Sequence, residues 1–323
     1  MKRKALVVGI DNYEKCPLDC CCNDAKTIAE LLRNNENGDP NFEVVELPNI
    51  SIKSELKSNI KRCFDGDVDV ALFYFSGHGF IDNSGGYLVT PDYKVDDWGV
   101  SLEDVLNIVN ASKIRNKIVI VDSCHSGFMG QIQLTGNSCS IIGNGVTILT
   151  ACKSDEVAVE GEKHGMFTSL LIEALNGAAA DILGRITIAS IYAYIDSNLG
   201  AWDQRPIFKT NISNFISVRD VRPRVEKEVL RKTMQYFDTT DYSCQLDPSF
   251  EYTNNPEYKY EYMKPYADKK NIEKFKNLQK LESVGLVVPE DEQHMYFAAM
   301  RSKKCKLTNI GKYYFKLVKN GKI

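Results

Sequence analysis

Five short runs rich in apolar residues alternate with helical patterns over the first 220 residues, and this alternation constrains the fold more than any other feature. The runs lie at residues 5–10, 42–47, 68–75, 117–121 and 146–150. Their apolar character is typical of strands that are covered on both faces. Between the first two runs, apolar residues recur at the spacing of one helix face, at Ala25, Ile28, Ala29 and Leu32. The alternation predicts an α/β fold, in which helices cover both faces of a mostly parallel sheet.

Further elements are predicted in the same region. We expect a short hairpin strand at 86–90, helices at 166–176 and 187–198, and a last strand at 214–218. We also expect a helix at 101–109 that begins at Ser101, because a serine hydroxyl and the acidic residues that follow it suit a helix N-terminus.

The composition is that of a globular protein, with 43% hydrophobic and 26% charged residues. No apolar run approaches the roughly 20 residues that span a bilayer. Only six apolar residues separate the basic start from Asp11, so the N-terminus predicts a first strand and not a signal peptide. The ten cysteines are then expected to be reduced thiols. We therefore expect a cytoplasmic protein that does not interact with a membrane.

The charge distribution suggests two modules. Residues 266–323 contain 13 Lys and Arg and 6 Asp and Glu, a net charge of +7, whereas residues 1–265 contain 27 and 37, a net charge of −10. Residues 221–265 are rich in Tyr, Asn, Asp and Pro, which indicates a connector that wraps the surface. In the last module we expect a helix ending near Gly285, strands at 295–300 and 305–307, and a helix at 312–318.

Two loops that follow buried strands carry the residues that could take part in catalysis. The first is Ser76-Gly77-His78-Gly79 and the second is Asp122-Ser123-Cys124-His125. Ligands of open α/β sheets gather outside the carboxyl ends of the strands, where both loops lie. A thiolate at Cys124 could attack a carbonyl while His78 serves as acid and base. The amide N–H groups of Gly79 and Cys124 could then hold the developing oxyanion.

The same segments resemble those of the caspase and metacaspase superfamily of clan CD cysteine peptidases. Within this superfamily, the chain resembles the prokaryotic-type caspase-like proteins. The resemblance spans roughly residues 4–218. Besides the two loops, the matching segments are Cys21-Cys22-Asn23-Asp24-Ala25, the G-x-F-T start of a helix at Gly165-Met166-Phe167-Thr168, and Gln204-Arg205-Pro206. The segment around Cys124 is similar to that of metacaspases and differs from the Q-A-C-x-G of animal caspases.

The resemblance implies a caspase-like peptidase domain over residues 1–220, with a large-subunit portion at 1–130 and a small-subunit portion at 145–220. It implies a polypeptide substrate that is hydrolysed at a position set by the residue before the cut. In metacaspases the pocket for that residue is acidic, and the matching positions here are Asp24, Ser76 and Asp122. Carboxylates bind guanidinium and ammonium groups well, so we expect cleavage after Arg or Lys.

The resemblance also raises the possibility of calcium as a cofactor, since many metacaspases need it. Asp92, Asp96 and Asp97 offer oxygen ligands of the kind calcium prefers, but Gln131 stands where a further family aspartate is expected. We expect no cofactor to be required. Residues 128–152 contain no Lys or Arg, so an enzyme specific for basic residues is expected to act as an uncut chain that a partner or ligand activates.

Alternative interpretations stay open for several residues. Cys16 and Cys20 to Cys22 lack the paired spacing of a zinc site, and His125 and His164 are expected to be structural or solvated. The last module, 266–323, resembles a small α+β winged-helix domain, and its basic residues at 301–306 suit either nucleic acid or a protein partner. The alternative to a protease in a stress, cell-death or defence pathway is a catalytically silent caspase-fold scaffold whose output is partner or nucleic-acid binding by this module.

Overall fold

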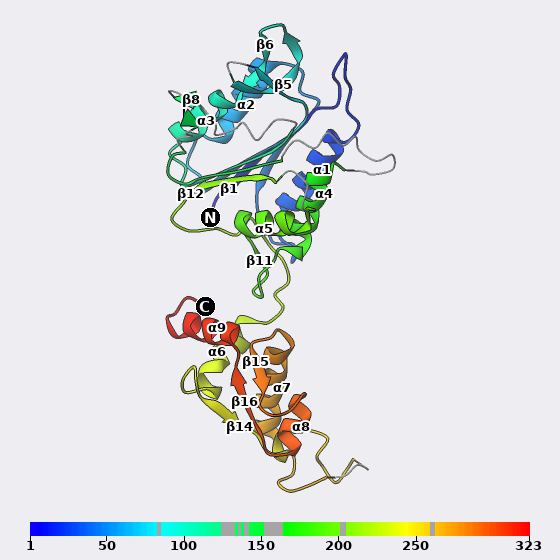
Figure 1. Cartoon of the computed structure of the whole chain (residues 1–323), viewed down its shortest axis with the longest axis vertical. Coiled ribbons are helices and arrows are strands. Elements are labelled where there is room, and N and C mark those ends of the chain that lie inside the picture. Colours follow the sequence, from blue (N-terminus) through cyan, green and yellow to red (C-terminus); the bar gives the residue numbers. More distant parts are fainter. Residues whose placement is uncertain are drawn as a thin grey trace. The chain divides into compact units, whose positions relative to one another are not determined.

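The computed structural model describes residues 1–82, 85–123, 133–134, 137–138, 142–151, 164–200, 205–258 and 262–323. The chain forms two compact units, Met1–Arg222 and Pro223–Ile323, and each is treated by itself below (Figure 1). No helix among the described residues is both long enough and apolar enough to cross a membrane.

The first unit is built on a six-stranded sheet with the order β12-β10-β7-β3-β1-β2. These strands are β1 (Arg3–Gly9), β2 (Glu43–Pro48), β3 (Val70–Ser76), β7 (Asn116–Asp122), β10 (Val146–Thr150) and β12 (Ile207–Asn211). All neighbours pair in parallel except β10 and β12, which are antiparallel. Every residue of β3 and β10 is buried, as the continuous apolar runs predict.

Helices cover both faces of this sheet (Figure 1). They are α1 (Cys21–Arg33), α2 (Lys53–Cys63), α3 (Leu102–Ala111), α4 (Met166–Glu173), the π-helical turn η2 (Ala174–Ala178) and α5 (Ile188–Asn198). Alternate strand residues divide between the two layers: Phe73 packs with α2 and α3, whereas Leu72 packs with α1, α4 and α5. The prediction of a mostly parallel sheet with helices on both faces is confirmed, and so is the cap at Ser101, whose side chain accepts from the amide of Asp104.

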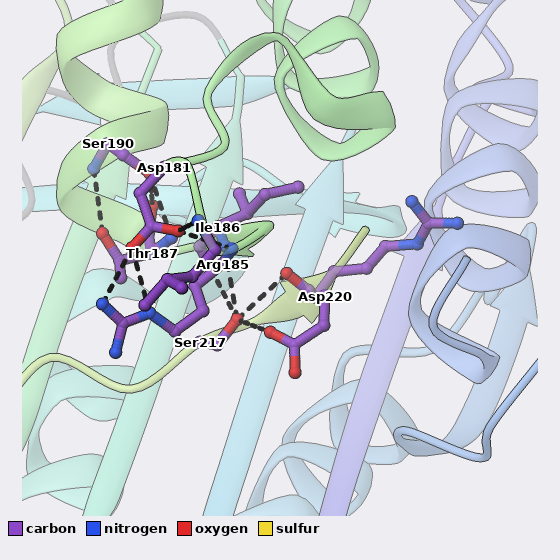
Figure 2. A network of polar contacts seen from close by, with 9 residues as sticks. Asp181, Arg185, Ile186, Thr187, Ser190, Ser217 and Asp220 are labelled. Atoms are coloured by element: carbon purple, nitrogen blue, oxygen red, sulfur yellow. Dashed lines mark hydrogen bonds and ion pairs between the residues drawn. The ribbon is translucent and has the colours of Figure 1, made fainter. Parts of the chain in front are cut away.

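Smaller sheets surround this core. They consist of the antiparallel strands β4 (Gly79–Asp82), β5 (Gly85–Lys94) and β6 (Asp97–Ser101), the pair β8 (Gln133–Leu134) and β9 (Asn137–Ser138), and the pair β11 (Arg185–Ile186) and β13 (Arg219–Asp220). A polar network supports the last pair, in which the Asp181 carboxylate accepts from Arg185 and the hydroxyl of Ser217 contacts Asp220 (Figure 2).

The prediction of a last strand at 214–218 is wrong. The sixth strand of the sheet is β12. It was not predicted because Lys209, Thr210 and Asn211 are polar, so the strand is not an apolar run. β12 lies at the end of the strand order, where one edge has no neighbour among the described strands and the side chains are only half-buried. Ser217 instead contributes to the polar network beside β11 and β13 (Figure 2).

The second unit combines helices with a three-stranded antiparallel sheet of the order β14-β16-β15. Its elements are α6 (Lys227–Tyr236), β14 (Ser243–Gln245), the 3-10 turn η3 (Pro248–Phe250), α7 (Lys269–Ser283), β15 (Val287–Pro289), α8 (Met295–Met300), β16 (Lys304–Leu307) and α9 (Asn309–Lys319). The likeness of this unit to a winged helix remains a prediction.

Two expectations for this unit are corrected. Residues 221–265 are not a connector, because α6, β14 and η3 belong to the second unit and β14 pairs directly with β16. The loop that follows η3 is held by the buried side chain of Asn254, which donates to the carbonyls of Pro248 and Met263. Residues 295–300 form the helix α8 and not a strand, since Met295, Ala298 and Ala299 are buried at helical spacing.

Candidate active site

The two loops singled out in the sequence leave the sheet side by side. β3 ends at Ser76 and the adjacent strand β7 ends at Asp122, and these two residues are partners in the parallel register. β1 lies on the other side of β3, and its last residue, Gly9, packs so closely against the start of α1 that a Cβ there would lie 2.2 Å from the carbonyl oxygen of Cys21. The topology thus brings the segment before α1 and both loops to one edge of the sheet.

His78 is held at this edge by two contacts that the sequence did not reveal. Its ring nitrogen Nε2 lies 2.7 Å from the carbonyl oxygen of Cys16. Its ring also packs at 4.6 Å from that of Tyr13, whose hydroxyl accepts from the amide of His78 and lies 3.2 Å from the carbonyl oxygen of Val89. A carbonyl oxygen can only accept, so Nε2 carries the proton in this contact and Nδ1 of a neutral ring is left as the basic nitrogen.

The predicted nucleophile Cys124 lies outside the described residues, as do His125 and Gln131. The chain is described up to Ser123, which is buried directly after β7. Gly79, the other predicted oxyanion donor, opens β4 immediately after His78. The described geometry therefore fixes the histidine side of the predicted dyad and the strand that leads to the cysteine.

The three predicted pocket residues meet around a buried carboxylate. Asp24, in the first turn of α1, is 1% exposed, and the hydroxyl of Ser76 donates to its Oδ2 at 3.3 Å. A Cβ placed on Gly165 would lie 3.6 Å from Oδ2 of Asp122 and 3.7 Å from Oδ2 of Asp24, so both carboxylates border the same position. The structure thus brings together Asp24, Ser76 and Asp122.

Two further residues hold these carboxylates in place. Nδ1 of His164 lies 2.7 Å from Oδ1 of Asp24. The hydroxyl of Thr168, in α4, donates to Oδ2 of Asp122 at 2.6 Å and lies 2.6 Å from the phenol oxygen of Tyr74. Since the Thr168 proton is used on Asp122, the buried phenol of Tyr74 must be the donor in the second contact. The result is a chain of hydrogen bonds that runs from Tyr74 through Thr168 to Asp122.

Burial shifts the titration of this cluster. It raises the pKa of Asp122 to about 7, against the opposing effect of the Thr168 hydrogen bond, and the nearby Asp24 raises it further. Burial likewise raises the pKa of Asp24, although the hydrogen bond and positive charge that His164 can supply act in the opposite direction. Two acids at one site that resist losing both protons are well suited to receive a cation.

Residues 2–216 match the family model of the caspase domain. The chain belongs to the caspase family. Among solved structures, one titled "structure of pro-sf-caspase-1" matches with a TM-score of 0.45 and 13% identity, and the match covers 68% of this chain and 91% of that one. None of the curated proteins searched matches the chain significantly.

In this caspase-family chain, the cysteines at the start of α1 are partly buried free thiols. Burial raises the pKa of Cys21 above its usual range and that of Cys22 to about 11, so both thiols stay neutral at physiological pH. The thiol of Cys22 donates to the carbonyl of Gly9 at 3.3 Å. Within the described ranges, no group of three or more His, Cys, Asp or Glu side chains could hold a metal ion.

Two of the three carboxylates considered for calcium, Asp92 and Asp97, contact Lys53 in the caspase domain. Asp92 accepts from the hydroxyl of Thr90 and from the amide of Lys53, the first residue of α2, while Asp97 forms an ion pair with the ammonium of Lys53. A cation at these carboxylates would have to displace Lys53, so the arrangement does not fit a calcium ion. The expectation that no cofactor is required stays a prediction.

The basic run at 301–306 is partly neutralised within the second unit. Arg301 forms an ion pair with Glu292 at 3.0 Å, and Lys306 with Glu290 at 3.3 Å. The attraction of this run for an external polyanion is correspondingly weaker than its sequence suggests.

Sequence reasoning missed Tyr13 and the carbonyl of Cys16, and it gave no role to Thr168. Thr168 lies in the G-x-F-T segment, so a signal was present, but the direction of its hydroxyl follows only from the packing of α4 against β3 and β7. Tyr13 carries no comparable signal. His164 was expected to be structural or solvated, and the structure places it against Asp24 with its side chain 21% exposed.

Proposed function

We propose that this caspase-family protein is a cysteine endopeptidase that hydrolyses peptide bonds after Arg or Lys. The observation that carries the proposal is the meeting of two carboxylates, the buried Asp24 and the partly buried Asp122, at the sheet edge where His78 and the segment leading to Cys124 emerge. A long cationic side chain that enters there gains a charge-assisted hydrogen bond to each carboxylate, which an acidic or apolar side chain cannot form.

The chemistry follows from the orientation of His78. With Nε2–H donated to the carbonyl of Cys16, Nδ1 is free to accept the proton of the Cys124 thiol. The thiolate attacks the carbonyl carbon of the scissile peptide, and the amides of Gly79 and Cys124 stabilise the oxyanion. His78 then returns the proton to the leaving amine, and water hydrolyses the thioester that remains.

An uncut chain is the second part of the proposal. Residues 128–152, which join the large and small portions, contain no Lys or Arg, so an enzyme of this specificity has no site there for its own cleavage. Intact-mass measurement during incubation should show either a full-length chain or cuts at basic positions elsewhere, such as Lys163 or Lys269. Recovery of an active form cut within 128–152 would contradict this part.

The deciding experiment is a panel of fluorogenic peptides with Arg, Lys, Asp or Ala before the reporter, assayed with and without calcium. Cleavage after Arg and Lys alone, lost in Cys124→Ala and in His78→Ala, is the expected result. Asp24→Asn and Asp122→Asn should raise KM for the basic peptides and leave the fold intact. Preference for Asp before the cut would overturn the proposed pocket.

A chain that awaits an activator could be silent in that assay, so a covalent probe supplies an independent test. A peptidyl arginyl chloromethyl ketone should form a thioether at Cys124 with loss of chloride, and peptide mapping should locate the adduct. Cys16→Ala, which removes an exposed cysteine near the site, is the matched control and should label normally. No labelling and no cleavage would favour the alternative, a catalytically silent caspase-fold scaffold.

A further inference from the structure

The first unit contains a second candidate site at the opposite end of the central sheet. A cavity of about 890 Å³ lies where β7 and β10 begin, within the size range of small-molecule sites. β7 runs from Asn116 at this cavity to Asp122 at the candidate active site, a distance of roughly 20 Å along an extended strand. The cavity is therefore separate from the peptidase site.

The charges that line this cavity are of one sign. Lys113, Arg115 and Lys117 all contribute to its wall, and none of the described residues that line it is an Asp or a Glu. This is unexpected, because residues 1–222 as a whole contain 21 Lys and Arg against 29 Asp and Glu. An adjoining cavity of about 660 Å³, which Lys113 also borders, has the mixed lining expected of such a unit, with Asp65 and Asp67 beside Lys61.

None of these three cations is paired with a carboxylate in the described part of the chain. Lys117 is 4% exposed, and its ammonium donates to the carbonyl of Ser112, just after α3. That contact satisfies one of its three N–H donors, and the end of a helix favours a cation. The other two donors of this ammonium have no acceptor among the residues that the structure describes, which is costly unless a ligand or water in the cavity accepts from them.

The remaining lining suits a small molecule that is only partly charged. Ile114, Ile212 and Ile216 supply apolar surface, and the carboxamides of Asn144 and Asn214 supply donors and acceptors. A smaller hollow that shares Lys117 and Ile216 with the cavity also contacts the exposed ring of Phe215. An anionic group held by the cations would thus have room for an uncharged portion beside it.

We propose that this cavity binds a small molecule that carries two or more linked phosphate groups. Lys113, Arg115 and Lys117 together carry three positive charges, which one carboxylate leaves largely unbalanced and which linked phosphates match more closely. Arginine favours the bidentate contacts that phosphate offers. The concave shape and the net negative charge of the unit argue against nucleic acid, whose long chain of phosphates would be repelled outside the cavity.

The test is calorimetric titration of the full chain with pyrophosphate, with ATP and with adenosine, in buffer of low ionic strength that contains EDTA. Pyrophosphate and ATP should bind with one-to-one saturation, and adenosine should not. Equal affinities for the first two would mean that the phosphates alone are recognised, and tighter binding of ATP would mean that the nucleoside adds contacts. Both results support the proposal, and the comparison tells whether the ligand is an inorganic polyphosphate or a nucleotide.

Variants locate the binding. Lys113→Gln combined with Arg115→Gln, both at exposed positions, should weaken pyrophosphate binding by about 100-fold, roughly tenfold for each lost charge-assisted contact. Lys26→Gln combined with Lys94→Gln removes the same charge from exposed positions away from the cavity and should leave the affinity unchanged. Lys117→Met, checked for its fold by near-UV circular dichroism, should also weaken binding.

Three results would overturn the proposal. The first is the absence of saturable binding of pyrophosphate and ATP at millimolar concentration. The second is an equal loss of affinity in the cavity variant and its control, which would indicate a general effect of charge. The third is unchanged binding when Lys113 and Arg115 are replaced. None of these results depends on peptidase activity.

Discussion

The imidazole Nδ1 of His164 lies 2.7 Å from Oδ1 of Asp24, so a half-buried histidine orients the most deeply buried carboxylate of the proposed substrate pocket. His164 stands next to Gly165, at the start of α4, whereas Asp24 comes from α1. Because Ser76 donates to the other oxygen of the same carboxylate, both oxygens of Asp24 are fixed before any substrate arrives. Asp24 is therefore preorganised, and His164 is a positioning residue.

Loss of this contact should affect substrate binding more than the chemical step. We expect His164→Ala to raise KM for an arginyl peptide about tenfold, the value of one lost charge-assisted hydrogen bond, and to leave kcat within about twofold. His164→Asn places an amide near the position of Nδ1 and should recover most of the affinity. The measurement is steady-state kinetics on arginyl and alanyl peptides, in which the alanyl peptide should respond to neither variant. A fall in kcat with KM unchanged would assign His164 to catalysis instead.

The raised pKa of Asp122 predicts how binding depends on pH. Burial brings this pKa to about 7, so at pH 6 most free enzyme holds a proton that a basic substrate must displace. The apparent affinity for an arginyl peptide should therefore rise as pH increases from 5.5 to 8, by at most about tenfold for each pH unit below 7. KM is measured for the wild type and for Asp122→Asn, whose KM should be higher and nearly independent of pH. The same pH dependence in both proteins would show that Asp122 is not the titrating group.

The same residue predicts an opposite trend for stability. Between the ordinary aspartate value near 3.8 and about 7, the folded protein binds a proton that the unfolded chain does not, so the free energy of unfolding falls as pH rises through this window. Asp122→Asn removes the buried charge but keeps an oxygen that can accept from Thr168. We expect this variant to be more stable than the wild type by roughly 1–3 kcal/mol at pH 8, with the difference shrinking toward pH 4.

Urea unfolding across this pH range measures the effect. Asp19→Asn changes an exposed aspartate and should leave the pH dependence of the wild type unchanged. If Asp122→Asn destabilises the protein at pH 8, the carboxylate makes a favourable contact that the described structure does not include. A pocket that is costly to keep ionised and needed for the substrate is typical of functional sites.

Part of the site could be predicted from the sequence because it depends on strand order alone. Ser76 and Asp122 each end a buried apolar run, and adjacent parallel strands bring their ends to the same edge. Asp24 was placed by the family resemblance, since the start of a helix does not by itself reveal which sheet edge it packs against. The contacts of His164 and Tyr13 could not be predicted, because they depend on how loops distant in the sequence return to the site.

The wrong predictions about the second unit also have physical causes. Residues 295–300 are a short apolar run, for which periodicity does not separate a helix from a strand. Residues 221–265 have the composition of a connector, but the hydrogen bonds of Asn254 and the pairing of β14 with β16 join them to the second unit. Such long-range contacts leave little trace in composition.

The chain of hydrogen bonds from Tyr74 through Thr168 to Asp122 should contribute to the stability of the fold. Thr168→Val removes the hydroxyl, which leaves the fully buried phenol of Tyr74 without its acceptor and leaves Asp122 with the backbone hydrogen bond of residue 168 but not the side-chain one. We expect a loss of about 2–4 kcal/mol in the free energy of unfolding, which is the cost of leaving buried polar groups without hydrogen-bond partners. Thr168→Ser keeps the hydroxyl and should cost about 1 kcal/mol for the lost methyl group.

A double-mutant cycle with Tyr74→Phe tests whether the three groups act as a unit. Once the phenol hydroxyl is absent, Thr168→Val leaves one buried polar group fewer without a hydrogen-bond partner. The double variant should therefore lose less stability than the sum of the two single variants. Loss of the Thr168 hydrogen bond should also raise the pKa of Asp122, because that bond favours the ionised carboxylate. The pH at which arginyl-peptide KM changes should therefore move upward in Thr168→Val and stay near the wild-type value in Thr168→Ser. Additive stabilities together with an unmoved pH profile would contradict the proposed chain.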